Sequence, residues 1–438
     1  MKKFISTVKN IFSIEDLRIR ILNTIGFLIV FRLGSFIVLP GIDPSQLSGP
    51  SEGIFGLIDT FLGGAFSNAS IFGLGIMPYI SASIVLQLLT VGVPYFQKLQ
   101  KEGESGRKRI SQITRVLTIV ITVAQGIGYL TATIPNEAIM INKTLFMFSS
   151  LVLLSAGTMF CMWLGEKITE KGIGNGISML IMIGIISRFP GAIMAESLSK
   201  GTGGILLLLI EAAVLFFVVV GVVALTEATR RIPVQYAKQV VGGKVYGGQR
   251  QYIPIKVNAS GVMPIIFAQS LMFLPALIAQ IWADTSEIAA YIGTTFSDFT
   301  SWQYNLVFAL MIILFTFFYT AITVNPEQIA EDMKRNGGFV PGIKPGAPTA
   351  DFIDNIISRI TLPGSILLSL VAIMPAFAIL AGVGGEFAQF YGGTSLLIMV
   401  GVIMDTLRQI ESYLLMRHYE GMMKSGNMKN DPSNYAVA

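Results

Sequence analysis

The sequence predicts an all-α membrane protein that crosses the bilayer several times. Of its 438 residues, 53% are hydrophobic and only 13% are charged, and the mean hydropathy is +0.67. Most of ten apolar segments approach the ~20 residues that a helix needs to cross the hydrocarbon core. The spans must be helical, because an unpaired backbone group in lipid costs several kcal/mol. The segments lie at 21–39, 73–92, 116–134, 145–165, 175–190, 204–226, 260–282, 303–324, 361–381 and 394–415.

Two internal repeats divide these segments into two halves. Residues 75–80 (GIMPYI) return as residues 261–266 (GVMPII), and residues 178–185 (SMLIMIGI) return as residues 395–402 (SLLIMVGV). The first repeat opens the second segment of each half, and the second lies in the fifth segment. Because each half has five spans, the second copy crosses the membrane in the opposite sense. This pattern is typical of an inverted repeat with a pathway between its halves.

The distribution of basic residues predicts the orientation. Lys and Arg are frequent in the N-terminal tail and again at 98–115, whereas none occurs at 33–97. The positive-inside rule therefore places the tail and the 98–115 connection in the cytoplasm. Continued alternation makes both termini cytoplasmic, and the net charge of +5 mostly reflects this bias. The basic residues that fall outside or within a span are Arg32, Lys143, Arg188 and Lys200.

The predicted organisation follows from spans and orientation. Its parts are a cytoplasmic N-terminal segment at 1–20, an N-terminal half at 21–190, an external hinge connection at 191–203, a C-terminal half at 204–415 and a cytoplasmic tail at 416–438. The 175–190 segment is short and rich in glycine, so we expect it inside the bundle.

Two cytoplasmic loops are longer than a simple connection needs. For the loop at 227–257, the sequence predicts two short extended arms around a glycine-rich tip. The loop at 325–360 contains a stiff turn that presents Lys344. Long ordered loops are usually functional. Binding of anionic lipid by their basic residues is the alternative.

The external connection after the first segment predicts a short helix. Its apolar residues follow helical spacing, and Gly63 and Gly64 can end the helix. A helix of ~10 residues is ~15 Å long, about half a membrane. We expect a re-entrant helix, with a helix on the outer surface as the alternative. The apolar residues are Ile54, Leu57, Ile58, Phe61 and Leu62.

The sequence contains no recognisable catalytic or metal-binding motif. The only histidine, His418, lies at the cytoplasmic end of the last span, so a Ser-His-Asp triad or a histidine metal site is excluded. Lys244 lacks the surrounding residues of a phosphate-binding loop. The single cysteine, Cys161, excludes an internal disulfide, and we expect it to be buried. We therefore predict neither catalysis nor a cofactor.

Five motifs stand out along the chain: 75–84 (GIMPYISASI), 162–166 (MWLGE), 172–178 (GIGNGIS), 392–395 (GGTS) and 403–405 (IMD). Together they resemble the bacterial SecY family, the central subunits of the Sec protein-conducting channel. The resemblance extends over about residues 15–425 and implies an hourglass pore between the two halves. It also implies an external plug at about 54–68, a lateral gate between the second-third and seventh-eighth spans, and export of unfolded polypeptides across the bacterial plasma membrane or laterally into it.

The resemblance also implies the pore and gate residues. A ring of isoleucines offers a passing chain no fixed hydrogen bonds and resists ions by dewetting. Ordinary helix packing is the alternative for these isoleucines, and helix–helix adhesion is the alternative for the gate residues. The implied ring is Ile80, Ile84, Ile181, Ile185, Ile266 and Ile398, and the implied polar gate cluster is Gln87, Gln125 and Asn258.

The family resemblance further implies partners. These are the small membrane subunits SecE and SecG, the motor ATPase SecA, the ribosome, and secretory preproteins with their signal peptides, with no other nucleic-acid site. The family usually has arginine where this chain has Lys344, and its loop tip is often more basic. The implied motor or ribosome contacts are Arg230, Arg231, Lys238, Lys244, Arg250, Lys256, Lys344 and Tyr419.

Three further charges lie within or beside spans. Asp405 and Arg408 are three residues apart on one helix, so we expect them to pair. Glu211 lies inside the sixth segment, and either Arg32 or an accessory subunit is its predicted partner. The rival function is a secondary transporter, which usually has charged or unwound elements at mid-membrane, where this chain has isoleucines.

Overall fold

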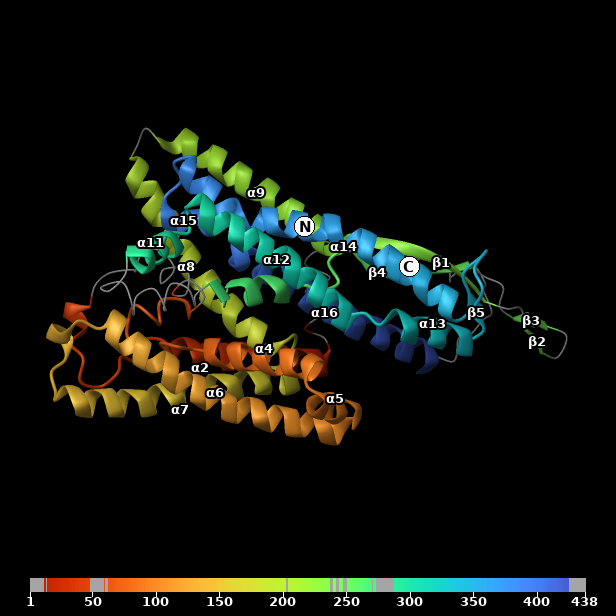
Figure 1. The fold of residues 1–438 in the computed structure, drawn as a ribbon, viewed down its shortest axis with the longest axis horizontal. Coiled ribbons are helices and arrows are strands. Elements are labelled where there is room, and N and C mark those ends of the chain that lie inside the picture. Colours follow the sequence, from red (N-terminus) through yellow and green to blue (C-terminus); the bar gives the residue numbers. More distant parts are fainter. Residues whose placement is uncertain are drawn as a thin grey trace.

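The helices are arranged in two groups that correspond to the two halves of the sequence. In the computed structural model, α2, α4, α6 and α7 lie together on one side, α9, α12, α14 and α16 lie on the other, and α8 crosses between them (Figure 1). The residues that the structure describes are 12, 14–47, 59, 62–201, 204–236, 239–241, 244–246, 250–269, 271–272 and 287–424.

The N-terminal half contains six α-helices and two short 3₁₀ helices among its described residues. They are α2 (Glu15–Gly34), η1 (Pro44–Gln46), α4 (Met77–Gly92), α5 (Pro94–Lys101), α6 (Glu104–Thr133), η2 (Asn136–Ala138), α7 (Lys143–Lys171) and α8 (Gly176–Lys200).

The C-terminal half contains seven α-helices among its described residues, with two long insertions that carry short strands. Residues 263–269 and 271–272 are also helical. Its helices are α9 (Ile205–Glu227), α11 (Glu287–Ser297), α12 (Trp302–Thr323), α13 (Pro326–Arg335), α14 (Ala347–Leu380), α15 (Gly385–Ala388) and α16 (Gly393–Lys424).

Side-chain caps determine where several helices begin. The Asn142 and Asn175 side chains accept hydrogen bonds from the first backbone N–H groups of α7 and α8. Ser301 and Asn325 do the same for α12 and α13. These residues satisfy donors that a helix leaves unpaired, which matters most where the chain enters a membrane.

Seven helices of the described residues are long and apolar enough to cross a membrane, and a bent pair raises this to as many as eight. The pair is α4 with α5, which meet at an angle of 97°. The first predicted segment, 21–39, overlaps α2 but ends beyond it, since the helix ends at Gly34 and its ends carry several charges. The seventh segment lies only partly within the described residues. The prediction of a mostly helical, multi-pass membrane protein is confirmed.

Both sequence repeats begin helices at equivalent positions. Met77 starts α4, and residue 263, which is its counterpart, starts the next helical run in the other half. The preceding glycines, Gly75 and Gly261, have positive φ angles of 51° and 63°. Gly176 and Gly393, the counterparts in the second repeat, start α8 and α16. The two halves therefore share local backbone structure at both repeats.

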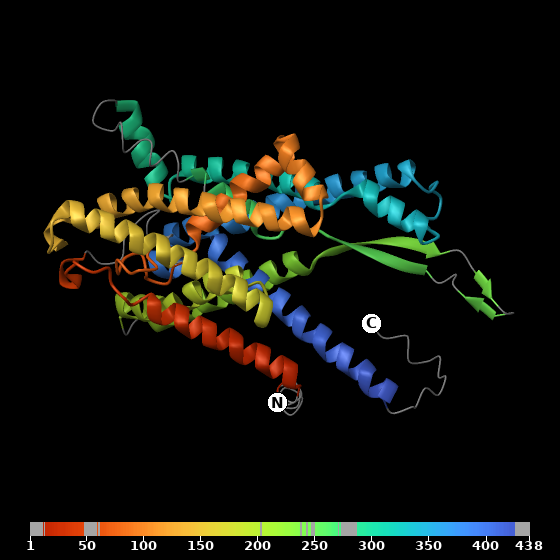
Figure 2. The ribbon, with the colours of Figure 1, turned by 90° about the horizontal axis from the view of Figure 1, so that it is seen from below.

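The predicted extended arms form an antiparallel hairpin. Strand β1 (Thr229–Tyr236) pairs with β4 (Arg250–Lys256), and β5 (Gly338–Phe339) from the second long loop adds to the other edge of β1. The tip carries a second pair, β2 (Gln239–Val241) with β3 (Lys244–Tyr246). Figure 2 shows the hairpin projecting beyond the helices.

A small hydrophobic core fixes this sheet to the helices. Ile232 and Val234 alternate with exposed residues along β1, as one buried face of a strand requires. They cluster with Met333 of α13 and with Ile353 and Ile357 of α14. The two long loops, which we predicted as separate loops, therefore form one packed unit.

One predicted boundary is wrong. Helix α8 continues to Lys200, so most of the predicted hinge connection at 191–203 is helical. Helix α16 continues to Lys424, so part of the predicted tail at 416–438 is helical, and the end of the span at 415 stays a prediction. Hydropathy falls after residue 190 because Glu196 and Lys200 are charged, but these two side chains pair with each other on the helix.

Candidate functional site

The six predicted ring isoleucines all belong to the largest hydrophobic cluster of the described residues, which draws on both halves of the chain. Five are buried, with exposed fractions of 0–8%, and Ile266 is half-buried against the same cluster. They come from α4, α8, α16 and the helical run at 263–269. All six positions are isoleucines, so together they have the apolar composition that a dewetting constriction needs.

Little of the predicted plug lies within the described residues. Ile54, Leu57, Ile58 and Phe61 are outside them, whereas Leu62 is 3% exposed. Leu62 packs so closely on Gly75 that a side chain at Gly75 would overlap it. Asp59 is 1% exposed. The burial of Leu62 and Asp59 favours a re-entrant segment, which folds back into the bundle, over a helix on the outer surface.

No hydrogen bond among the described residues joins the three predicted gate residues. Gln87 on α4 donates to Ser83 one turn away, at 3.4 Å, and Asn258 accepts from Ser260 at 3.2 Å. Gln125 is half-buried on α6, which packs beside α4. The polar gate cluster therefore stays a prediction.

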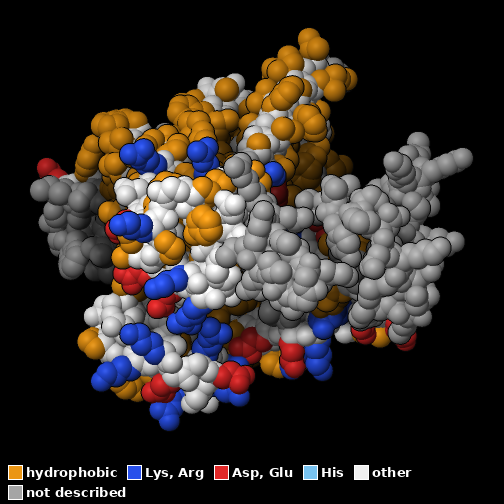
Figure 3. Space-filling view, turned by 90° about the vertical axis from the view of Figure 1, so that its right-hand side faces the viewer, with side chains coloured by type: hydrophobic (Ala, Val, Ile, Leu, Met, Phe, Trp, Pro, Cys, Tyr) orange, Lys and Arg blue, Asp and Glu red, His pale blue; other side chains and the backbone are white. Residues whose placement is uncertain are grey.

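The predicted cytoplasmic contacts lie on one end of the molecule. Arg230 and Arg231 on β1, Lys256 at the end of β4, and Lys344 are all exposed. Figure 3 shows charged side chains of both signs gathered on the lower part of this end, where Figure 1 places α5 and α6 rather than the hairpin. Lys244 and Arg250 belong to strands β3 and β4, and Tyr419 belongs to α16, whereas Lys238 lies outside the described residues.

Arg32 and Glu211 do not pair, so that prediction is wrong. Arg32 donates to the carbonyl oxygen of Gly63 at 2.8 Å and lies over the ring of Phe36. Glu211 instead pairs with Lys200, from the end of α8. The sequence pointed to Arg32 because both side chains lie within predicted spans, but the unexpected length of α8 brings Lys200 to Glu211.

The residues described contain no group of three or more His, Cys, Asp or Glu side chains that could hold a metal ion. Cys161 is fully buried in α7, as predicted.

The family can now be assigned. The SecY family profile matches residues 70–407. This chain belongs to the SecY family. The protein translocase subunit SecY of Streptomyces coelicolor is 44% identical over 435 residues, which cover 94% of this chain and 98% of that protein. SecY of Halalkalibacterium halodurans is also 44% identical, covering 95% of this chain and 99% of that protein.

Solved structures share the fold at low sequence identity. A SecY structure in which the plug domain is said to stabilise the closed channel has a TM-score of 0.66 and 18% identity, covering 90% of this chain and 92% of that chain. Canine Sec61 in a ribosome-channel complex has a TM-score of 0.63 and 18% identity, with the same coverage of each chain. The family resemblance and the channel fold are thus confirmed.

The SecY family motif at 172–178 forms the turn between α7 and α8. Backbone groups of this turn bond to α2 and α16: Thr24 accepts from Ile173 N–H at 3.0 Å, and Gln409 accepts from Gly174 N–H at 2.8 Å. The turn therefore ties an early helix of the N-terminal half to the last helix of the C-terminal half.

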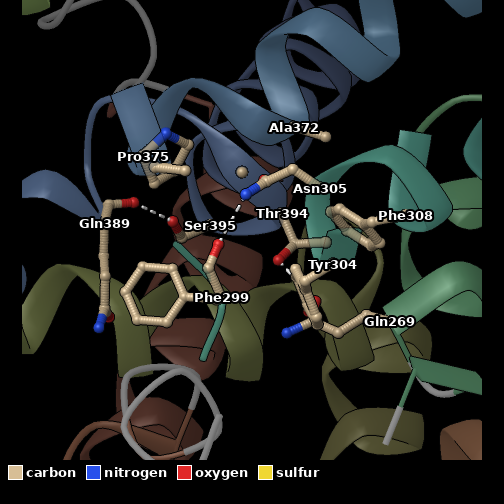
Figure 4. A pocket seen from close by; sticks show the side chains of 12 residues that line it. Gln269, Phe299, Tyr304, Asn305, Phe308, Ala372, Pro375, Gln389, Thr394 and Ser395 are labelled. Atoms are coloured by element: carbon tan, nitrogen blue, oxygen red, sulfur yellow. Dashed lines mark hydrogen bonds between the residues drawn. The ribbon is translucent and has the colours of Figure 1, made fainter. Parts of the chain in front are cut away.

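One small pocket of this SecY-family chain lies between α12, α14 and α16. Phe299, Tyr304 and Phe308 line its apolar side. Its polar groups bond to the protein itself, since Thr394 donates to Gln269 at 2.7 Å and Asn305 donates to the carbonyl oxygen of Phe299 at 2.9 Å (Figure 4). These bonds indicate packing between helices rather than a prepared ligand site.

Arg408 has a partner that the sequence did not reveal. It lies 2.6 Å from Glu227 at the end of α9, but 3.9 Å from the predicted partner Asp405. Glu227 is 181 residues away in the chain, so spacing along one helix could not find it.

We expect Glu227→Gln to weaken the protein more than Asp405→Asn. Because these side chains are about one-third to two-thirds exposed, each loss should be ~1 kcal/mol or less. A double-mutant cycle on the thermal unfolding of the purified protein should couple Arg408→Gln to Glu227→Gln. Stronger coupling to Asp405→Asn would contradict the geometry.

Proposed function

We propose that this chain is the channel-forming subunit of a bacterial protein translocase, and that it passes unfolded secretory polypeptides across the plasma membrane and membrane proteins laterally into it. The observation that carries the proposal is the cluster of isoleucines from four elements of both halves. Family membership and the curated relatives, which are translocase subunits, agree with it.

The isoleucine ring is proposed to be the pore constriction. Branched apolar side chains close around one another and exclude water, which resists ion flow while the channel is shut. They make no fixed hydrogen bonds with a moving polypeptide, so different sequences can pass. Separation of the halves would widen the ring, because Ile80 and Ile84 belong to one half and Ile398 to the other.

Gating is proposed to use a plug at about 54–68 and a lateral gate near Gln87, Gln125 and Asn258. Hydrogen bonds between membrane helices average only ~0.6 kcal/mol, which suits a gate that must open. The fold shared with a plugged SecY channel supports the plug. The exit for signal peptides and membrane segments would lie at this gate.

The projecting hairpin is proposed to dock a cytoplasmic motor, SecA, or the ribosome. Its exposed basic residues, Arg230, Arg231 and Lys256, suit contacts with acidic protein or with ribosomal RNA. The ribosome-bound canine relative supports the second partner. SecE and SecG are the proposed membrane subunits, and both termini are proposed to be cytoplasmic.

Disulfide crosslinking tests the channel proposal. In a Cys161→Ala background, Ile84→Cys or Ile398→Cys would be combined with a precursor that carries one cysteine and is arrested during export. We expect disulfides at both ring positions, because the constriction surrounds the moving chain. Val214→Cys is the matched control, since Val214 is 44% exposed on α9 and does not belong to the cluster.

Arrest must be shown separately, by protease protection of the precursor. Arrest without crosslinks at either ring position would refute the pore assignment and return these isoleucines to ordinary packing. Crosslinks at Val214→Cys as strong as those at the ring would refute it too.

A further inference from the structure

The turn at residues 62–70, which contains the last part of the proposed plug at about 54–68, is fixed at several points. Gly63 and Gly64 have φ angles of 62° and 93°, in the left-handed region that favours glycine. A side chain at Gly63 would meet Arg32, Ser187 and the backbone of Gly184 within 3.0 Å. Gly184 directly precedes the ring residue Ile185, so this turn lies against the constriction.

Two helices of the N-terminal half hold the backbone of the turn. Arg32 of α2 donates to the carbonyl oxygen of Gly63 at 2.8 Å, and Tyr129 of α6 donates to that of Phe66 at 2.7 Å. Tyr129 is 4% exposed and its ring packs on Phe66 at a centroid distance of 4.6 Å. Buried, charge-assisted or well-aligned bonds of this kind are costly to break.

A third helix holds the turn through an ion pair. Arg188 of α8 pairs with Asp59 and also donates to the Ser67 hydroxyl at 3.3 Å. The other carboxylate oxygen of Asp59 accepts from the Ser67 backbone N–H at 3.0 Å. The Asp59 side chain is 2% exposed and that of Arg188 is 26% exposed.

We propose that Arg188 and Asp59 are positioning residues that keep the 62–70 turn seated on α8 while the channel is closed. The inference rests on the proposed channel function. A carboxylate buried to this degree needs its cation, because an unpaired buried charge is strongly unfavourable. Arg188 lies one helical turn from Ile185, so any widening of the ring that moves α8 away from the turn also separates this pair.

The pair therefore couples two events. When the halves are together, the ion pair holds the turn against the ring, and the closed state is favoured. When α8 moves away, Asp59 loses its cation, and the 62–70 turn is released from α8. Removal of Arg188 should then leave a channel that translocates but no longer seals.

Ion leakage tests this inference. The full-length chain, purified with its membrane subunits, would be reconstituted in vesicles of phosphatidylethanolamine and phosphatidylglycerol, and chloride release would be recorded under a potassium gradient with valinomycin. We expect Arg188→Gln and Asp59→Asn each to raise the leak roughly 10-fold or more, because each leaves a buried partner unpaired. Lys167→Gln is the control, since Lys167 forms an exposed ion pair with Glu170 on α7, and it should not change the leak.

The double variant decides the mechanism. Removal of both partners leaves no unpaired charge, so Arg188→Gln with Asp59→Asn should leak far less than the product of the two single increases. Arg188→Lys should leak less than Arg188→Gln, since it keeps the charge, and it carries the comparison if Arg188→Gln does not fold. The inference would be overturned if the single variants leaked no more than the unmodified protein. It would also be overturned if the leak of the double variant equalled the product of the two single increases.

The two proposals fail separately. Leakage that depends on Arg188 and Asp59, without crosslinks at the isoleucine ring, would refute the proposed polypeptide pathway but support the role of the ion pair. Crosslinks at the ring, in a channel whose ion leak is unchanged by Arg188→Gln, would support the pathway and refute the role of the ion pair.

Discussion

Lys200→Met is expected to destabilise the protein by about 3–5 kcal/mol, because it leaves two buried carboxylates without a cation. Lys200 lies 2.6 Å from Glu196 and also pairs with Glu211. The side chains of Glu196 and Glu211 are only 3% and 9% exposed, and that of Lys200 is 13% exposed. Thermal unfolding of the purified protein, followed by light scattering or intrinsic fluorescence, would measure the loss.

This cluster lies where the two halves of the chain meet. Glu196 accepts from the backbone N–H of Gly384 at 3.0 Å, and the Tyr391 hydroxyl donates to the carbonyl oxygen of Glu211 at 2.7 Å. A side chain at Gly384 would overlap the Glu196 carboxylate and displace it from this hydrogen bond. Loss of Lys200 should therefore loosen the junction between α8, α9 and the α14–α15 connection as well as the ion pairs.

Two variants separate charge from packing. Glu196→Gln should recover part of the loss in a Lys200→Met background, because it removes one of the two unpaired charges. Lys167→Met is the exposed control, and we expect a change of ~1 kcal/mol or less. A Lys200→Met protein as stable as this control would show that the cluster contributes nothing.

Much of the architecture could be predicted because it depends on patterns along the chain. Apolar length predicted most of the long helices, and the repeats predicted that residues far apart in sequence, such as Ile80 and Ile398, belong to equivalent places in the two halves. Both residues are buried in the same cluster. The extended arms at 230–236 and 250–256 were visible because proline and glycine interrupt the apolar periodicity there.

The charged contacts could not be predicted in the same way. Arg188, Glu211 and Arg408 each pair with a residue on another element. Which element lies beside them depends on where helices end and how they cross, and hydropathy ended α8 ten residues early. The i, i+4 spacing of Glu196 and Lys200 was the one signal in the sequence that could have extended this helix.

Gly176→Ala is expected to cost about 3 kcal/mol or more, because an added methyl group would be forced into a neighbouring backbone. Gly176 is the first residue of α8, and its N–H donates to the Thr169 hydroxyl at 2.9 Å. A Cβ at this position would overlap the carbonyl oxygen of Gly165, and backbone atoms cannot move aside as a flexible side chain can.

The control for this variant lies in the same helix. Gly191 of α8 has open space around it, so Gly191→Ala should keep the fold and add up to ~1 kcal/mol of stability through its higher helix propensity. The same substitution thus has opposite expected signs at the two positions. We expect Gly176→Ala to lower the thermal midpoint and to weaken the bond from Gly174 N–H to Gln409, which links α16 to the turn before α8. Equal midpoints for the two variants would show that the close approach of α7 and α8 at Gly176 does not limit stability.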